Sequence, residues 1–206
     1  MTAGWEYEAR AMAQGFRAVC GIDEAGRGPL AGPVVAAAVI LPYHVEIDGL
    51  DDSKKLTEKK REALYDVICE KAVAFSVAAV DEKVIDEINI LNATFLAMKN
   101  AVAGLPQPAD FALVDGNRSK GLEIPFACVV GGDAKVPSIA AASVLAKVTR
   151  DRFMCEMAAQ YPQYGFEKHK AYGTKAHYAA LDAYGPSPIH RMSFLKKYFA
   201  SRGETL

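Results

Sequence analysis

Four carboxylates share a setting that suggests metal chemistry, because each follows a short apolar segment. Asp23 and Glu24 close the first such segment, and Asp115 and Asp133 follow two later ones. A single aspartate at the end of a strand is more often a turn residue or a helix cap. Clustered carboxylates, in contrast, repel one another and are costly to bury unless cations lie between them. Oxygen ligands without a zinc-binding Cys/His set favour Mg²⁺ or Mn²⁺.

A glycine-rich run follows the first pair of acids, and it fits neither of two common nucleotide-binding motifs. In residues 26–32, GRGPLAG, the third glycine is one place too late for a dinucleotide fingerprint, and an apolar strand follows where that motif needs a helix. The chain has no Gly-Lys pair and therefore no P-loop. Two interpretations remain, a plain turn or a place where backbone approaches a ligand with Arg27 as a nearby cation.

The elements that must position these acids alternate along the chain as in an α/β fold. Apolar runs predict strands over residues 17–24, 34–41, 74–80, 111–115 and 126–130. Helical spacing predicts helices over residues 57–72, 90–102, 139–160, 175–184 and 194–199, the first capped by Thr57 and the third by Ser138. The first two strands are too close in sequence for a helical crossover, so the sheet should be mixed.

Composition points to one globular domain. The chain has 206 residues, of which 51% are hydrophobic and 24% charged, values typical of folded proteins. Its longest apolar run, 34–41, has eight residues and is too short to span a membrane. The first twenty residues contain Glu6 and Glu8 and lack the apolar core of a signal peptide, so we expect a cytoplasmic protein with four reduced, packed cysteines.

Charge is distributed unevenly along the chain. From Lys147 onward there are ten Lys and Arg against five Asp and Glu, whereas the preceding residues have 14 against 20. Three of the four histidines also lie in this basic part. It could follow a phosphate backbone, although scatter in surface composition explains the same imbalance equally well.

The motifs in the chain match one family. Residues 21–39, GIDEAGRGPLAGPVVAAAV, closely resemble the signature of bacterial ribonuclease HII. Shorter matches follow in the family's order: DSKKL at 52–56, LVDGN at 113–117, GD at 132–133 with 138–151, YPQY at 161–164, HKAY at 169–172 and HR at 190–191. The resemblance covers about residues 17–198. Gly131, where members often have Lys, and Ala171, where they usually have Gly, depart from the pattern.

The resemblance implies a ribonuclease H-like fold, a mixed five-stranded sheet flanked by helices with a helical C-terminal extension. We expect one catalytic domain over residues 1–206, with a core at about 17–160 and a substrate-binding part at about 161–200. The implied enzyme is an endonuclease that cuts the RNA strand of RNA/DNA hybrids and nicks duplex DNA 5′ of embedded ribonucleotides, leaving 3′-hydroxyl and 5′-phosphate ends. We expect this chain to act as a monomer. Two divalent ions, Mn²⁺ or Mg²⁺, would be held by Asp23, Glu24, Asp115 and Asp133.

Substrate choice needs further residues, because the 2′-hydroxyl alone separates the two sugars. The resemblance assigns its recognition to the backbone of Gly26, Arg27 and Gly28 and to Tyr172, whose ring would pack on the neighbouring deoxyribose. Phosphate contacts are expected from seven basic residues: Lys54, Lys55, Lys168, His169, Lys170, Arg191 and Lys196. For each, the plain alternative is an ordinary packed or solvated side chain.

Two other functions remain open from the sequence. A ribonuclease H-like nuclease of the resolvase or integrase type would leave a ribonucleotide-containing duplex uncut. A non-catalytic nucleic-acid binder that uses the basic C-terminal part would bind without cleavage in Mg²⁺, and the presence of all four acids weighs against it.

Overall fold

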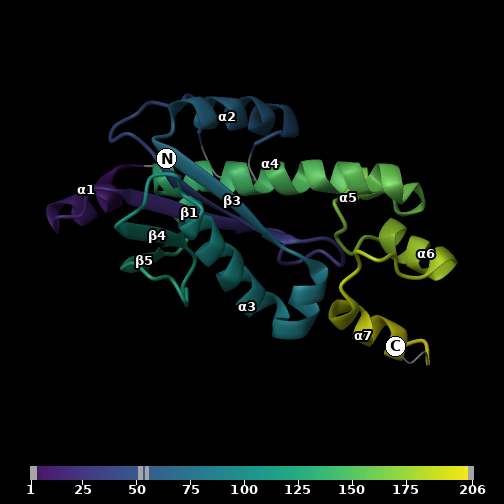
Figure 1. The fold of residues 1–206 in the computed structure, drawn as a ribbon. Coiled ribbons are helices and arrows are strands. Elements are labelled where there is room, and N and C mark those ends of the chain that lie inside the picture. Colours follow the sequence, from purple (N-terminus) through teal and green to yellow (C-terminus); the bar gives the residue numbers. More distant parts are fainter. Residues whose placement is uncertain (1–3, 51–52, 54–55, 204–206) are drawn as a thin grey trace.

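A mixed five-stranded sheet forms the centre of the molecule, as the sequence predicts (Figure 1). The computed structural model describes residues 4–50, 53 and 56–203. The strands lie in the order β3-β2-β1-β4-β5, where β2 is antiparallel to β1 and β3, and β4 runs parallel to β1 and β5. Their bounds are Val19–Ala25 for β1, Val34–Ile40 for β2, Ala74–Val80 for β3, Phe111–Asp115 for β4 and Phe126–Val129 for β5.

Helices cover both faces of the sheet, which explains why β2 is apolar throughout. Alternate side chains of a strand point to opposite faces. Val34, Ala36 and Ala38 accordingly pack in the layer of α3, Glu82–Ala103, whereas Val35 and Ala37 pack in the layer of α4 and α2. These last two helices span Pro137–Gln160 and Glu58–Lys71, and α2 lies over α4 (Figure 1).

Helix α3 extends further than its sequence pattern indicates. It begins at Glu82, where Asp81 accepts a hydrogen bond from the backbone N–H of Val84, and it breaks at Asn89, with φ 66° and ψ 162°. The Asn89 side chain then caps the second part by accepting from the N–H of Leu91 and Asn92. The predicted helix, 90–102, corresponds only to this second part.

The start of α4 shows that the prediction of Ser138 as the N-cap of this helix is wrong. Val136 occupies the N-cap position and Ser138 lies inside the helix, where its Oγ donates to Glu8 Oε1 at 2.8 Å. Glu8 belongs to α1, Glu6–Ala13, a short helix that the sequence analysis missed because it has no capping side chain. A Cβ on Gly21 would lie 2.1 Å from the Ser138 carbonyl carbon, so this glycine permits α4 to pack directly on β1.

The C-terminal helices form a layer of their own beyond the end of α4 (Figure 1). They are α5 Phe166–His169, α6 Lys175–Tyr184 and α7 Met192–Ala200, and two 3₁₀ turns, Gly132–Ala134 and Pro162–Tyr164, precede them. Their apolar cluster includes Phe166 and Leu195 and takes in Leu30 and Ala31 from the β1–β2 turn. The helices therefore pack against the glycine-rich run.

Two further sequence predictions, on membrane-spanning helices and on the cysteines, can be compared with the structure. No helix in the described ranges combines the length and apolar character needed to cross a bilayer. All four cysteines are free, as expected, but Cys155 is exposed, so the prediction that every one of them packs internally is wrong for this residue.

Candidate active site

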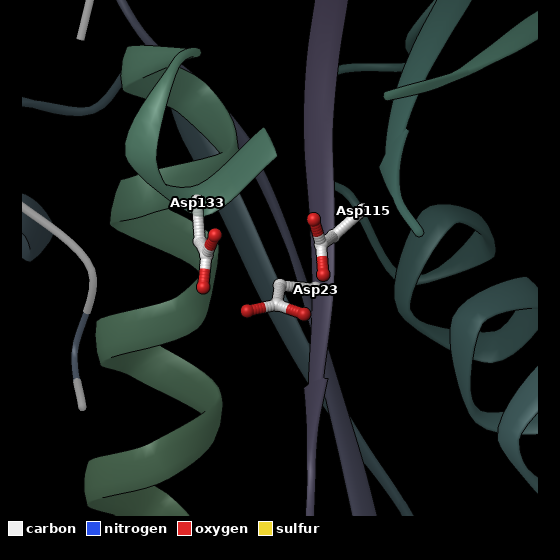
Figure 2. Close-up of side chains that lie close together, drawn as sticks. All are labelled: Asp23, Asp115 and Asp133. Carbon is white, nitrogen blue, oxygen red and sulfur yellow. The ribbon is translucent and has the colours of Figure 1, made fainter. Parts of the chain in front are cut away.

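Three aspartates from three separate elements converge at one edge of the sheet (Figure 2). Asp23 lies near the end of β1, Asp115 is the last residue of β4, and Asp133 lies in the 3₁₀ turn after β5. Because β1, β4 and β5 are parallel, their carboxyl ends meet at the same edge. Each aspartate offers one oxygen within 4.8 Å of the others, so the three carboxylates can surround a common cation.

The electrostatics of this cluster are unfavourable without a counter-charge. Asp23 is buried, and its pKa is raised well above the ordinary value by burial first and then by the charges of Glu24 and Asp115. The backbone N–H of Glu24 donates to Asp23 Oδ1 at 2.7 Å and partly offsets this rise. The N–H of Gly132 donates to Asp115 Oδ1, also at 2.7 Å, and ties the turn that carries Asp133 to β4.

Glu24, the fourth predicted acid, lies outside the convergent group of three found among the described residues. Neighbouring residues of a strand point to opposite faces of the sheet, so the side chains of Glu24 and Asp23 lie on opposite faces of β1. Oε1 of Glu24 lies 3.1 Å from Arg27 Nη1. Glu24 nevertheless lines the same cleft as Asp115.

The cleft consists of two hollows that share Glu24, Arg27 and Asp115. The first, which we call the Tyr172 hollow, has a volume of about 250 Å³ and reaches across the glycine-rich run to Tyr172. The second has about 240 Å³ and lies against α3, with Phe95 in its wall. Both predicted recognition elements, the Gly26–Gly28 backbone and Tyr172, therefore line one hollow with Asp23.

Two buried arginines hold the glycine-rich run in place. Arg191 donates from Nη2 to the carbonyl of Gly26, from Nη1 to those of Arg27 and Pro29, and from Nε to that of Gly32, over 2.7–3.2 Å. The prediction that Arg191 contacts phosphates is thus wrong, because its side chain is completely buried among these acceptors.

Arg150 extends the same arrangement. It donates to the carbonyls of Pro33 and Ala31 and, through Nη1, to that of Lys170. Burial lowers the pKa of Arg150 to about 10 and that of Arg191 to about 9. A Cβ on Gly26 would lie 2.2 Å from Arg150 Nε, so the turn and the guanidinium fit together only with glycine at this position.

Tyr172 projects from an unusual stretch of backbone. The two residues before it, Lys170 and Ala171, both have left-handed conformations, with φ 47° and 66°. Glycine adopts this region without strain, whereas other residues pay a conformational penalty of roughly 1 kcal/mol or more each. The ring of Tyr172 is 47% exposed, and its Cε1 would lie 3.5 Å from a Cβ placed on Gly28. The alanine at 171 thus keeps the backbone shape that a glycine would allow.

The remaining basic residues differ in accessibility. Lys168 and Lys196 are exposed and stay candidates for phosphate contacts. Lys170 is largely covered, with 12% of its side chain exposed and its Nζ 2.6 Å from the Glu167 carbonyl. The phosphate contact of His169 stays a prediction; in the structure its Nδ1 is buried and its Nε2 lies 2.9 Å from the Tyr164 carbonyl oxygen. Lys54 and Lys55 lie outside the described residues.

The sequence analysis missed three polar residues of α4 that line the Tyr172 hollow: Ser143, Lys147 and Arg150. Their i, i+4, i+7 spacing on a helix that is otherwise largely buried is the signal that could have found them. Ser143 Oγ lies 2.7 Å from Ser53 Oγ, and its hydroxyl lowers the pKa of Asp23. Lys147 Nζ pairs with Asp151 at 2.7 Å. Ser143, Lys147 and Arg150 therefore place polar groups in the wall of the hollow that Asp23 and Asp115 also line.

The site fits divalent cations on chemical grounds. The convergent atoms are all carboxylate oxygens, which suit Mg²⁺ and Mn²⁺ and not the softer metals. The raised pKa of Asp23 shows that its ionised form lacks sufficient positive charge nearby. A bound cation would supply that charge, and Asp23, Asp115 and Asp133 are the residues placed to hold it.

Comparison with known proteins places the sequence and the fold in one family. The family model described as Ribonuclease HII matches residues 20–197. Ribonuclease HII of Caldicellulosiruptor bescii is 56% identical over 192 residues, 93% of each chain, and that of Dechloromonas aromatica is 61% identical over 176 residues, 85% of this chain and 90% of the relative. The crystal structure of ribonuclease H2 from Pyrococcus horikoshii OT3 has a TM-score of 0.73 at 27% identity and covers 86% of this chain and 93% of its own.

Proposed function

This chain belongs to the ribonuclease HII family and is a ribonuclease H type endonuclease; we propose that it nicks duplex DNA on the 5′ side of an embedded ribonucleotide and cuts the RNA strand of RNA/DNA hybrids with two divalent ions, Mg²⁺ or Mn²⁺. The products would carry 3′-hydroxyl and 5′-phosphate ends. The observation that carries the proposal is the convergence of Asp23, Asp115 and Asp133 beside the Gly26–Gly28 turn.

Each acid has a distinct part in holding the ions. Asp23 is buried and fixed by the Glu24 N–H, so its carboxylate has little freedom to turn away. Asp115 is oriented by the Gly132 N–H, and Asp133 follows directly on that turn. Glu24 lies outside the convergent group, and we include it in the proposed ligand set because it lines the same cleft as Asp23 and Asp115. When bound, the ions would activate the attacking water and neutralise charge on the phosphate.

The same cleft supplies a rationale for choosing a ribonucleotide. The Gly26–Gly28 backbone lies beside the acids, where it can approach a 2′-hydroxyl that a longer side chain would keep away. Tyr172 faces this turn with an exposed ring, a surface that suits the flat face of a deoxyribose but not an additional hydroxyl. A ribonucleotide followed by a deoxyribonucleotide satisfies both elements at once.

The test uses a duplex with one ribonucleotide and its all-DNA twin, each with Mg²⁺, with Mn²⁺ and with a chelator. We expect a single nick in the first duplex, only with metal, on the 5′ side of the ribonucleotide. End analysis should give a 3′-hydroxyl and a 5′-phosphate. Cleavage of the all-DNA twin at a similar rate, or full activity in excess chelator, would contradict the proposal.

A further inference from the structure

The backbone that presents Tyr172 cannot hold its shape by local preference. Lys170 and Ala171 both adopt left-handed conformations that residues with side chains disfavour, so the segment needs outside support. Its carbonyls receive that support. The Leu30 N–H donates to Ala171 O at 2.8 Å, and Arg150 Nη1 donates to Lys170 O at 3.2 Å.

The carbonyl of Tyr172 itself has two donors. One is the N–H of Thr174 at 2.8 Å, and the other is Nδ1 of His177 at 3.0 Å. Thr174 is the N-cap of α6, and His177 lies in the first turn of that helix, where its own N–H donates to the Thr174 hydroxyl. Two hydrogen bonds thereby connect α6 and its N-cap to the carbonyl of Tyr172, and one of them comes from the imidazole of His177.

Hydrogen-bond chemistry assigns the protons of His177 and its neighbour His190. The carbonyl of Tyr172 can only accept, so Nδ1 of His177 carries the hydrogen and Nε2 of this neutral ring is an acceptor. His190 Nε2, at 3.0 Å, must therefore donate to it. This leaves His190 Nδ1 as an acceptor, which matches the N–H of Ser187 that donates to it at 2.8 Å. The chain of bonds runs in one direction, from Ser187 through both rings to Tyr172.

The setting of these rings keeps them neutral and away from substrate. His177 is fully buried and His190 is 2% exposed. His177 stacks on His169 with ring centroids 4.7 Å apart and meets the edge of Phe166 at 5.5 Å. Burial lowers the pKa of both His177 and His190, which agrees with the neutral rings assigned from the hydrogen bonds. The hydrogen bond from His177 to the carbonyl of Tyr172 is the link that connects this buried pair to the cleft.

We propose that His177, oriented by His190, is a positioning residue for Tyr172 and sets the preference of the enzyme for a single ribonucleotide in DNA over a continuous RNA/DNA hybrid. The inference rests on the proposed function of Tyr172 at the sugar that follows the ribonucleotide. In a continuous hybrid that sugar carries a 2′-hydroxyl, so correct placement of the ring brings less advantage there. Loss of the His177 bond should thus impair the single-ribonucleotide substrate selectively.

The test compares cleavage rates on the two substrates, because their ratio cancels changes in metal binding and in the fraction of folded protein. His177→Leu removes the donor to Tyr172, and we expect the ratio of single-ribonucleotide to hybrid cleavage to fall about tenfold, the effect of losing one positioning hydrogen bond. His177→Asn retains a short N–H donor and should recover the ratio to within about threefold of wild type. Tyr164→Phe is the matched control, because it removes a hydrogen bond to the Gly185 carbonyl from the same cluster without touching Tyr172.

A second measurement is independent of activity. Long-range ¹H–¹⁵N NMR correlations of the imidazole rings should show His177 protonated at Nδ1 and His190 at Nε2. An Nε2–H tautomer for His177 would contradict the inference, as would an unchanged substrate ratio in folded His177→Leu. Should that variant not fold, His190→Asn breaks the chain one step earlier, and an unchanged ratio there has the same meaning. Wild-type protein that cuts neither duplex would contradict the proposed function and this inference with it, whereas wild-type cleavage with no change in the ratio contradicts the inference alone.

Discussion

The two sides of the cleft are held by different kinds of interaction. On the acid side, Asp23 and Asp115 lie on hydrogen-bonded neighbouring strands, and the register that pairs Ile22 with Val114 brings their carboxylates together. On the recognition side, the glycine-rich run and the segment before Tyr172 are irregular backbone. Their carbonyls are bound by Arg150, Arg191 and His177.

This difference follows from the hydrogen-bonding needs of buried backbone. A strand satisfies its carbonyls through its neighbours, so a strand can carry an acid with no further support. Irregular backbone has no such partner, and buried carbonyls without donors are costly. A guanidinium with five N–H donors satisfies several of them at once. Substitutions on the acid side should therefore affect chemistry, whereas those beneath the recognition side should affect stability and substrate choice.

The largest effect is expected beneath the recognition side. Arg191→Met should lower the free energy of unfolding by about 4 kcal/mol, because four carbonyls, three of them in buried hydrogen bonds, lose their charged donor. Arg27→Met, in the turn that Arg191 holds, is the matched control, since its exposed ion pair with Glu24 contributes less than about 1 kcal/mol. Urea unfolding of both variants in chelator provides the measurement. Equal losses would mean that the buried bonds of Arg191 contribute nothing special.

Asp23→Asn should show the opposite behaviour on the acid side. We expect a cleavage rate reduced at least about a hundredfold, a barrier increase of about 2.7 kcal/mol, because the amide cannot supply the negative charge that holds the cation. In chelator the variant should be more stable than wild type, because it removes a carboxyl group whose ionised form is disfavoured by burial and by acidic neighbours, which together raise its pKa. Thermal melts with and without Mg²⁺ test this, and added Mg²⁺ should stabilise only the wild type. A less stable Asp23→Asn in chelator would show that the acids do not repel one another.

These two sides also differ in how far the sequence predicts them. The acids were found because strand periodicity locates the carboxyl ends where they gather, and the five strands follow from that periodicity. The phosphate contact predicted for Arg191 is wrong, because a basic residue in a short family motif looks the same in the sequence whether it faces solvent or the interior. Only tertiary structure shows that Arg191 meets the carbonyls of a turn about 160 residues earlier.

Local sequence patterns likewise predict neither the break in α3 nor the short helix α1. Asn89 interrupts the helix without proline or glycine, and its own side chain caps the part that follows by accepting from the N–H groups of Leu91 and Asn92. Helix α1 is held by Glu8, which accepts hydrogen bonds from Ser138 at a sequence distance of 130 residues. Contacts of such long range leave no periodic trace in the sequence.

The buried histidines should make the recognition side sensitive to acid. The pKa of His190 is lowered to about 4 by burial first and by His177 second, against 6.5 for the free side chain. At pH values between these two pKa values, the unfolded chain binds more protons than the folded chain. The free energy of unfolding should therefore fall by about 2 kcal/mol as the pH drops from 7 to 5. His169 and Tyr164 are further titratable side chains in ring contact with the pair. His190→Gln should remove this part of the dependence of the unfolding free energy on pH, as measured by urea unfolding at several pH values. The same pH dependence in the variant and the wild type would assign the acid sensitivity to other groups.

The smallest effect concerns the strain at Ala171. Its φ of 66° favours glycine, but Ala171→Gly also removes a buried methyl group and gives the unfolded chain more freedom. These contributions nearly cancel, so we expect a change in unfolding free energy below about 1 kcal/mol. Ala142→Gly removes an equally buried methyl from α4, where alanine is the preferred residue, and should cost about 1 kcal/mol more than the change at 171. The difference between the two variants measures the left-handed strain itself, because the methyl and unfolded-state contributions are common to both. If both substitutions lower stability equally, then the backbone before Tyr172 is unstrained, and its shape needs less support from Arg150 and His177 than their hydrogen bonds imply.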